Sequence, residues 1–399
     1  MVLQIIGTPC SAGADNTSAT EAKTPPAGVR QKLLALEPGR GLVLGKAAVL
    51  GEFNDVARDH SLDRTGPRGR DFSVKMVWAP DRDAALFLGA NHGSPHRLND
   101  VWEFDLDAMA WRMLYASDNS RSYAGLGKDM SDVLFKDGVL VTKRGGPAVI
   151  GHTWWGMAYD WTDRQILYMN TWATDQDKAI LALGGDPMQR YKGPPLWSFD
   201  PTSKSWGAIK SNGPYPRAPF AGFMEYVEPL GGVVWHSNHW QMRATWLFRT
   251  RSGEWEKLAE HGKEVDYLGE VPRQEQVGYY DPIRRILVLS SGTRTSHFDV
   301  IRKRWRKIID EPEGSDHVPD AHDARTPMYF DPKSGHGILV DLKSSRIWGY
   351  DPDRGAWSNL QIDGDPMPSG KKQLAYFDAN FNVVVVLTEN KVWVYRYQG

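Results

Sequence analysis

Apolar and polar residues alternate along this chain in units that recur about every 50 residues. The first kind of unit has two short apolar runs joined by an acidic or Pro-containing turn, as in MAYDWTDRQILYM around Asp160 and YYDPIRRILVL around Asp281. Val, Ile, Leu, Tyr and Phe on both sides of Asp, Pro and Gly predict β-hairpins. Comparable units surround Asp81, Glu228, Asp331 and Asp378.

A second kind of unit follows most of the hairpins. It has an aromatic residue, usually followed by Asp, with a Trp seven residues further on. The five copies pair Phe104 with Trp111, Phe199 with Trp206, Phe248 with Trp255, Phe298 with Trp305 and Tyr350 with Trp357, and a truncated copy, Trp393-Val394-Tyr395, lies close to the C-terminus. A period near 50 with strand-like alternation predicts a propeller blade, because a lone small sheet cannot bury both of its faces.

The fold class predicted from these units is all-β, a β-propeller with six blades counted. We assign the hairpin to strands b and c of each blade and the aromatic-Asp unit to an outer strand d, with a strand a before b. The interval from Phe104 to Phe199 spans almost two periods and contains an extra hairpin-like run at 132–143. This run leaves open a seventh blade or a decorated blade, and residues 28–60 are another candidate to complete the ring.

From these blade units the chain resembles the kelch-type propellers, the superfamily that includes galactose oxidase-like domains. The resemblance covers roughly residues 70–399 and implies a kelch-like β-propeller. It does not imply one activity, because propellers serve as binding scaffolds, oxidases, epimerases and lyases.

Composition narrows the function classes. The 48 basic and 49 acidic residues leave a net charge of −1, which argues against binding nucleic acid through bulk charge. The single cysteine, Cys10, excludes an internal disulfide, a cysteine-rich zinc site and the Cys-Tyr crosslink that the resemblance to galactose oxidase would require. No apolar run has the length of a membrane span.

The N-terminal segment differs from the rest. Residues 1–28 are small, polar and aperiodic after MVLQIIG, so we predict a disordered leader or signal remnant there and one propeller domain over 29–399. We expect a secreted or periplasmic monomer.

Histidines concentrate in connections that should share one face of the disc. Consecutive strands of a blade are antiparallel, so alternate connections lie on the same face. Eight of the 11 histidines fall in such connections: His92, His96, His152, His236, His239, His297, His317 and His322.

Cations recur on the same predicted face. They lie at the predicted start of strand b or in the c–d connections, at Arg70, Arg97, Arg217, Arg243, Arg273, Arg325 and Lys371. Equivalent positions of successive blades surround the channel mouth, so these cations predict an anionic ligand.

Aromatic residues flank these charges. Trp154 and Trp155 adjoin His152, Trp240 adjoins His239, and Tyr191 lies in a long insertion. Aromatic rings beside His and Arg are typical of sugar subsites. Only one of Trp154 and Trp155 is available, because adjacent strand residues point to opposite sides.

The first functional interpretation is a lyase that cleaves an acidic, uronate-containing polysaccharide by β-elimination. The set of His, Tyr and Arg resembles that of propeller-type ulvan lyases, although no His lies about 20 residues before His152. We assign the acid and base to His152 and His239, the catalytic partner to Tyr191, and the carboxylate contacts to Arg243 and Arg325. Further substrate contacts are predicted at His96, Arg97, Trp155, Arg217, Trp240 and Arg273.

The alternative is a non-catalytic secreted propeller that binds glycan or protein on the same face. No cofactor is required by either interpretation. A divalent metal is an open alternative at His317, His322 and Asp323, which have suitable ligand types without a diagnostic spacing.

Overall fold

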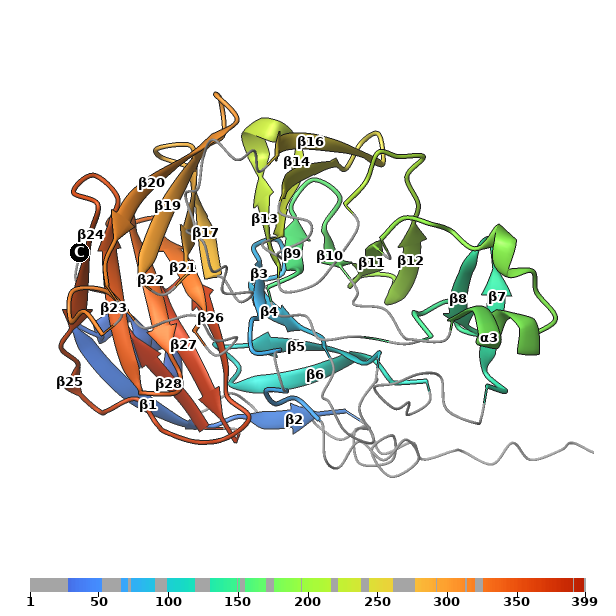
Figure 1. The fold of residues 1–399 in the computed structure, drawn as a ribbon. Helices are drawn as coiled ribbons and strands as arrows, with labels where there is room; N and C mark the ends of the chain where they lie inside the picture. The colour runs from blue at the N-terminus through green and yellow to red at the C-terminus, as the bar shows by residue number, and fades with distance from the viewer. Residues whose placement is uncertain are drawn as a thin grey trace, which may run out of the picture.

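The computed structural model contains six small antiparallel sheets arranged as the blades of a propeller, which confirms the predicted fold class (Figure 1). It describes residues 28–51, 66–70, 73–89, 99–118, 130–148, 150, 155–169, 176–194, 196–216, 222–237, 244–260, 277–291, 293–312, 314–319, 326–389 and 391–397. No helix among these residues is long and apolar enough to cross a membrane.

Each of the first five blades is built from four consecutive strands. Blade 1 has β3 (Val77–Ala79), β4 (Ala84–Phe87), β5 (Val101–Asp105) and β6 (Ala110–Tyr115). Blade 2 has β9 (Met157–Asp160), β10 (Gln165–Met169), β11 (Leu196–Asp200) and β12 (Ser205–Ile209). Blade 3 has β13 (Gly222–Val227), β14 (Gly232–Ser237), β15 (Ala244–Arg249) and β16 (Glu254–Glu260). Blade 4 has β17 (Val277–Asp281), β18 (Ile286–Ser290), β19 (Arg294–Asp299) and β20 (Arg304–Asp310), and blade 5 has β21 (Met328–Asp331), β22 (His336–Asp341), β23 (Arg346–Asp351) and β24 (Ala356–Leu360).

The sixth blade joins the two ends of the described chain. The strands β26 (Leu374–Asp378), β27 (Val383–Thr388) and β28 (Lys391–Tyr395) pair with β1 (Arg40–Lys46), whose Leu42 lies opposite Val394. Residues within 28–60 therefore complete the ring. Two short parallel strands extend the sheets: β25 (Asp363–Gly364) beside β1, and β2 (Ala48–Leu50) beside β6.

The extra hairpin at 132–143 is not a blade. Its strands β7 (Val133–Lys136) and β8 (Val139–Thr142) pair with each other and with no other strand, so the described residues form six blades. Helix α3 (Gln176–Ala182) and the 3₁₀ turn η2 (Pro187–Gln189) lie within blade 2, between β10 and β11. Helix α1 (Val29–Ala35) buries Leu33 in the core that blades 1 and 6 share.

The strand order within a blade corrects our assignment by one position. The hairpin forms the two innermost strands, the aromatic-Asp unit ends the third strand, and its Trp lies on the outermost strand. Burial agrees with this order: β26 and β27 are buried on both faces near the centre, whereas the outer strand β24 fully buries only Trp357. We letter the strands a to d from the centre outwards below.

The repeated Trp residues pack in the core, as predicted. Each aromatic residue pairs across the sheet with its Trp, for example Phe298 with Trp305 at 5.2 Å between ring centroids. The five Trp side chains are 0–8% exposed. Trp305 of blade 4 donates to Thr245 Oγ1 of blade 3 at 2.7 Å, so these residues also connect neighbouring blades.

Candidate functional site

The two faces of the disc differ in the connections that they carry. The a–b and c–d connections are four-residue turns, such as 161–164 and 250–253, and we call their side the turn face. The b–c and d–a connections leave the opposite side, which we call the long-connection face. The one-position shift in strand lettering leaves the grouping of connections unchanged, so the predicted histidine connections join strand ends on the long-connection face.

Most predicted site residues lie outside the described residues. These are His96, Arg97, His152, Arg217, His239, Trp240, Arg243, Arg273, His322, Asp323 and Arg325. Their roles stay predictions. The described members are Tyr191, Trp155 and His317.

Tyr191 lies half-buried after η2, and its hydroxyl is engaged by backbone. It accepts a hydrogen bond from the Ser211 N–H at 2.9 Å and donates to the Ser211 carbonyl at 3.2 Å. Burial raises the pKa of this hydroxyl, and the Ser211 N–H partly offsets that shift. The ring lies 5.9 Å from that of Tyr215. In this arrangement Tyr191 connects the insertion to blade 2.

Trp155 packs in the core between blades 2 and 3. Its side chain is 1% exposed, and it forms a parallel bridge with Phe223. An indole that is so deeply buried offers no ring face to a saccharide, so the structure gives Trp155 a packing role.

His317 is exposed in the connection between blades 4 and 5. Its two proposed co-ligands, His322 and Asp323, lie outside the described residues. Among the residues that the structure does describe, no three His, Cys, Asp or Glu side chains are grouped so as to hold a metal ion.

Two other histidines of the predicted face are packing residues. His236 on β14 is 1% exposed, and its Nδ1 lies 3.0 Å from Thr245 Oγ1. His297 lies within β19 rather than in a connection, and its Nε2 contacts the Tyr350 hydroxyl at 2.7 Å. Burial lowers the pKa of His297 to about 4, with Arg306 and Arg284 contributing, so the ring is neutral at pH 7.

Arg70 is not a free cation at the channel mouth. Its side chain is 1% exposed and forms a bidentate pair with Asp100, with Nη2 to Oδ2 at 2.5 Å and Nη1 to Oδ1 at 3.0 Å. Asp100 also accepts a hydrogen bond from Trp102 Nε1 at 2.6 Å. This buried pair fastens the start of blade 1 to its b–c connection.

The long-connection face carries a local insertion over blade 2. The hairpin β7–β8, from a d–a connection, packs against α3 and η2, from a b–c connection. Gly138 accepts a hydrogen bond from the Tyr191 N–H at 2.9 Å, and Asp137 accepts one from Lys210 Nζ at 2.7 Å. Structured insertions in otherwise tight repeats are commonly functional.

A cavity of about 340 Å³ opens at the centre of the turn face. Six aromatic residues at equivalent positions of the six a strands line it: Trp78, Tyr159, Tyr226, Tyr280, Phe330 and Phe377. The sequence does contain a signal for this cavity, because each hairpin unit has one aromatic residue just before its turn. These residues were interpreted above only as strand residues.

A charged pair from two non-adjacent blades also lines this cavity. Lys75 at the start of blade 1 donates to Glu225 Oε1 of blade 3 at 2.6 Å and to the Met224 carbonyl at 3.1 Å. Burial raises the pKa of Glu225, and Lys75 opposes the shift. The pair links blades 1 and 3 past the inner strand of blade 2.

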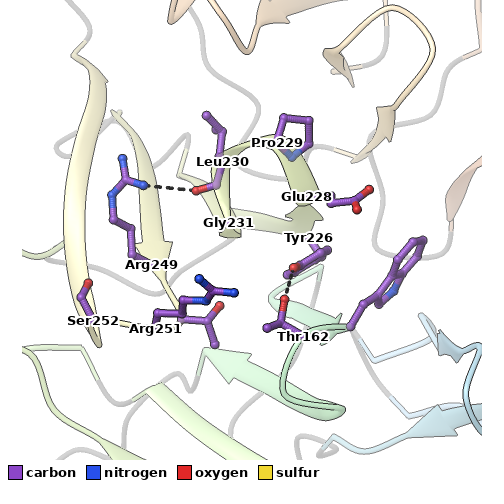
Figure 2. Close-up of a pocket in the computed structure, with 11 residues that line it drawn as sticks. Thr162, Tyr226, Glu228, Pro229, Leu230, Gly231, Arg249, Arg251 and Ser252 are labelled. Carbon is purple, nitrogen blue, oxygen red and sulfur yellow. Dashed lines mark hydrogen bonds between the residues drawn. The ribbon is translucent and has the colours of Figure 1, made fainter.

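A second hollow of about 600 Å³ adjoins this cavity between the turns of blades 2 and 3 (Figure 2). Trp161, Tyr226 and Glu228 line both spaces, and Arg249 and Arg251 belong to the hollow alone. This region contains none of the site residues predicted from the sequence. Its signal is the absence of Asp after Phe248, where Arg249 stands instead.

Comparisons with known proteins identify no family for this chain. No protein-family model matches the chain, and no curated protein matches it. The structure is similar to TolB from Acinetobacter baumannii, with 9% identity, a TM-score of 0.40, and coverage of 73% of this chain and 55% of TolB. It is also similar to a chain of a nidogen/laminin complex, with 13% identity, a TM-score of 0.39, and coverage of 75% of this chain and 91% of that chain. The chain thus spans about half of the TolB chain, and these likenesses carry no argument about activity.

Proposed function

We propose that this protein is a kelch-type propeller that binds an acidic, uronate-containing polysaccharide on the long-connection face and cleaves it by β-elimination. One observation carries the proposal. The connections with the predicted His and Arg residues all join strand ends of one face, and the described insertion of β7, β8 and α3 is built up on that same face.

The proposed reaction needs only side chains. A base removes the proton at C5 of the uronate, the electron pair forms the C4–C5 double bond, and the C4–O bond breaks. A general acid protonates the leaving oxygen. His152 and His239 fill the acid and base roles, and Arg243 with Arg325 neutralises the carboxylate as negative charge develops.

Tyr191 is the least supported member of this set. A phenol with a raised pKa that is bound to the Ser211 backbone must give up two hydrogen bonds before it can transfer a proton. We therefore propose that Tyr191 holds the insertion in place during binding, and we retain its catalytic role as a hypothesis for mutagenesis.

The alternative is a non-catalytic propeller that binds glycan on the same face. The engaged hydroxyl of Tyr191 favours it, because it removes a described residue from the reacting set. In this alternative the cations bind the polymer, and the histidines supply hydrogen bonds.

One experiment separates the two. Purified protein is incubated with a panel of uronate polysaccharides while absorbance near 235 nm reports the unsaturated product, and calorimetry reports binding. A lyase produces absorbance that Arg243→Ala strongly reduces. Binding without absorbance on every polymer overturns the lyase proposal and leaves the binding module, and neither signal overturns both.

Export from the cytoplasm is part of the same proposal, because a polysaccharide lyase must reach its polymer. Cell fractionation of the source organism tests it, and protein found only in the cytoplasm would contradict it.

A further inference from the structure

We infer that the hollow between the turns of blades 2 and 3 is a second binding site, specific for a saccharide unit that carries a negative charge. We define this turn-face hollow by Trp161, Thr162, Tyr226, Glu228, Arg249 and Arg251. It lies on the face opposite the proposed lyase site, and the inference does not rest on that proposal.

The hollow offers an aromatic platform. Trp161 is 55% exposed, although it is a large apolar side chain. One of its faces stacks on Tyr226, with ring centroids 5.9 Å apart and planes 24° apart. The Tyr226 hydroxyl in turn bonds to Thr162 Oγ1, which holds Tyr226 in place (Figure 2). Trp161 is therefore supported from one side while its surface remains open to a sugar ring.

Arg251 supplies the charge. Its side chain is exposed, and no hydrogen bond or ion pair ties its guanidinium to another described residue. The other arginine of the hollow is already engaged, because Arg249 Nε donates to Glu256 at 3.0 Å and its Nη1 to the Leu230 carbonyl at 3.2 Å. Arg251 is thus left to bind a carboxylate or sulfate through its planar fork.

The repeat explains why this hollow differs from the other turns. In blades 1, 2, 4 and 5 an Asp ends the c strand and accepts hydrogen bonds from the turn N–H groups, as Asp299 does in blade 4. Blade 3 has Arg249 there, and Val227 where blades 2, 4, 5 and 6 have Asp at the end of the a strand. Blade 3 therefore lacks these two turn carboxylates, and Glu228 is the single carboxylate among the described residues that line the hollow.

The remaining polar groups suit the hydroxyls of a sugar. Glu228 is an exposed acceptor on the rim, and Ser252 adds an exposed hydroxyl group. A volume of about 600 Å³ exceeds one pyranose and leaves room for a second unit. An anionic pyranose could stack on Trp161, bind Arg251 and form hydrogen bonds with the neighbouring acceptors. An inorganic anion would use only Arg251, so the hollow fits the sugar better.

The test is a titration of the full protein with D-glucuronate, D-glucose 6-sulfate and D-glucose, followed by saturation-transfer NMR. We expect the two anionic sugars to bind with a Kd on the order of 1 mM and D-glucose roughly tenfold more weakly. Arg251→Ala and Trp161→Ala should each weaken anionic-sugar binding roughly tenfold.

Controls keep the sites apart. Arg354→Ala removes an exposed arginine from the matching turn of blade 5, where the neighbouring blade 4 has Pro282 in the place of Trp161, and should leave binding unchanged. His152→Ala, a variant of the proposed lyase site, should leave the effect of Arg251→Ala unchanged. The inference is overturned if D-glucose or inorganic sulfate binds as tightly as the anionic sugars. It is also overturned if Arg251→Ala and Trp161→Ala keep wild-type affinity with unchanged melting curves. A negative lyase assay does not bear on this site.

Discussion

The turn face and the long-connection face of this propeller are built from the same strands but follow different rules. On the turn face every a–b and c–d connection described has four residues, and the fourth adopts a left-handed conformation, as Arg164 and Arg285 do at φ 54° and 56°. On the long-connection face the connections range from 389–390 to 116–156, which includes β7 and β8. The connection length is therefore constant on the turn face and varies from blade to blade on the long-connection face.

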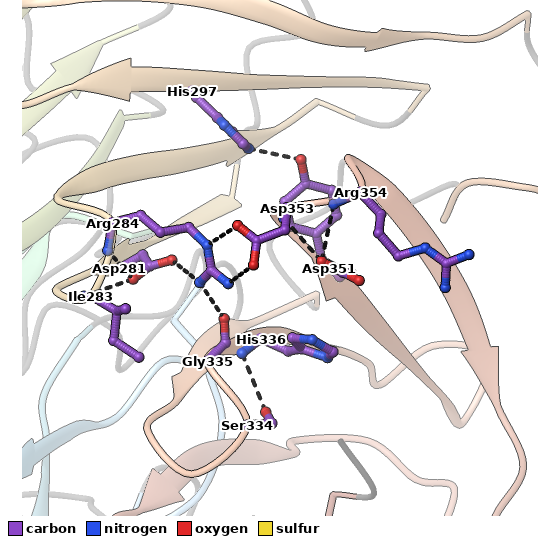
Figure 3. A network of polar contacts seen from close by, with 11 residues as sticks. Asp281, Ile283, Arg284, His297, Ser334, Gly335, His336, Asp351, Asp353 and Arg354 are labelled. Carbon is purple, nitrogen blue, oxygen red and sulfur yellow. Dashed lines mark hydrogen bonds and ion pairs between the residues drawn. The ribbon is translucent and has the colours of Figure 1, made fainter.

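The turn face is held by contacts between neighbouring turns. Arg284 of blade 4 donates to Asp353 in one turn of blade 5 at 2.7 Å and to the Gly335 carbonyl in the other at 2.8 Å, while it also binds its own Asp281 (Figure 3). Asn380 of blade 6 bonds to Asp83 of blade 1 in a similar way. Such contacts need every turn to keep the same length.

The comparison teaches that a departure from the repeat is the feature to look for on the regular face. Blade 3 lacks both turn Asp residues and adjoins the turn-face hollow, whereas blade 4 keeps them and uses Asp281 to anchor Arg284. The connections of the long-connection face differ from blade to blade, so a departure from a repeat cannot be recognised there. A functional role on that face has to be argued for each residue separately.

The largest expected effect is on catalysis at the long-connection face. If elimination is the reaction, His152→Ala or His239→Ala should lower turnover 10²- to 10⁴-fold, because a positioned acid or base contributes that much. Turnover is measured at 235 nm. Arg354→Ala on the turn face is the matched surface control and should keep full activity. Equal activity in both histidine variants would remove these two residues from the mechanism.

Trp305→Ala should cost about 3–5 kcal/mol of the free energy of unfolding, because it empties a buried site and leaves Thr245 without its indole donor. Trp161→Ala on the turn face should cost about 1 kcal/mol or less, because that ring is half exposed and loses only one stacked pair. Urea unfolding of both variants checks the difference. Similar losses would contradict the division into packing and surface tryptophans.

Breaking the buried ion pair of the long-connection face should also be costly. Asp100→Ala leaves the Arg70 guanidinium buried without its carboxylate, at a cost of about 3–5 kcal/mol. Asp353→Ala breaks an ion pair whose carboxylate is 72% exposed, and it should cost less than about 1 kcal/mol. Thermal melts compare the two. A small loss for Asp100→Ala would mean that Arg70 finds another partner or water.

A smaller effect depends on pH. Burial raises the pKa of Asp378 on the turn face to about 6, although the Phe381 and Asn380 N–H groups oppose the shift. Because the folded pKa exceeds the unfolded value, the contribution of Asp378 to stability is complete below about pH 4 and is lost as the pH rises through 6. The loss reaches up to about 3 kcal/mol.

Asp378→Asn removes this dependence while it keeps a side-chain oxygen for the turn. The difference in unfolding free energy between wild type and this variant should therefore shift in favour of the variant from pH 4 to pH 7. Denaturant unfolding at both pH values measures it, and a constant difference would show that Asp378 titrates normally.

The sequence by itself determined the repeat and the packing of the tryptophans, and it counted six blades while a seventh stayed open. Period-two alternation identifies strands locally, and a large aromatic residue at the same place in five copies needs the same buried site in each. The position of Trp305 was thus predictable from its neighbours in the chain.

Only the tertiary structure decided which strand lies at the centre, how the ring closes and what each polar residue contacts. Alternation does not encode the radial order of strands, and β1 closes the sixth blade without the Trp that marks the outermost strand of the other five blades. The partner of Arg70 lies 30 residues away, and the turn-face hollow joins residues 161 and 251, so neither follows from local pattern. Sequence periodicity reports burial along one strand, whereas a site arises where different blades meet, and that meeting depends on the three-dimensional path of the whole chain.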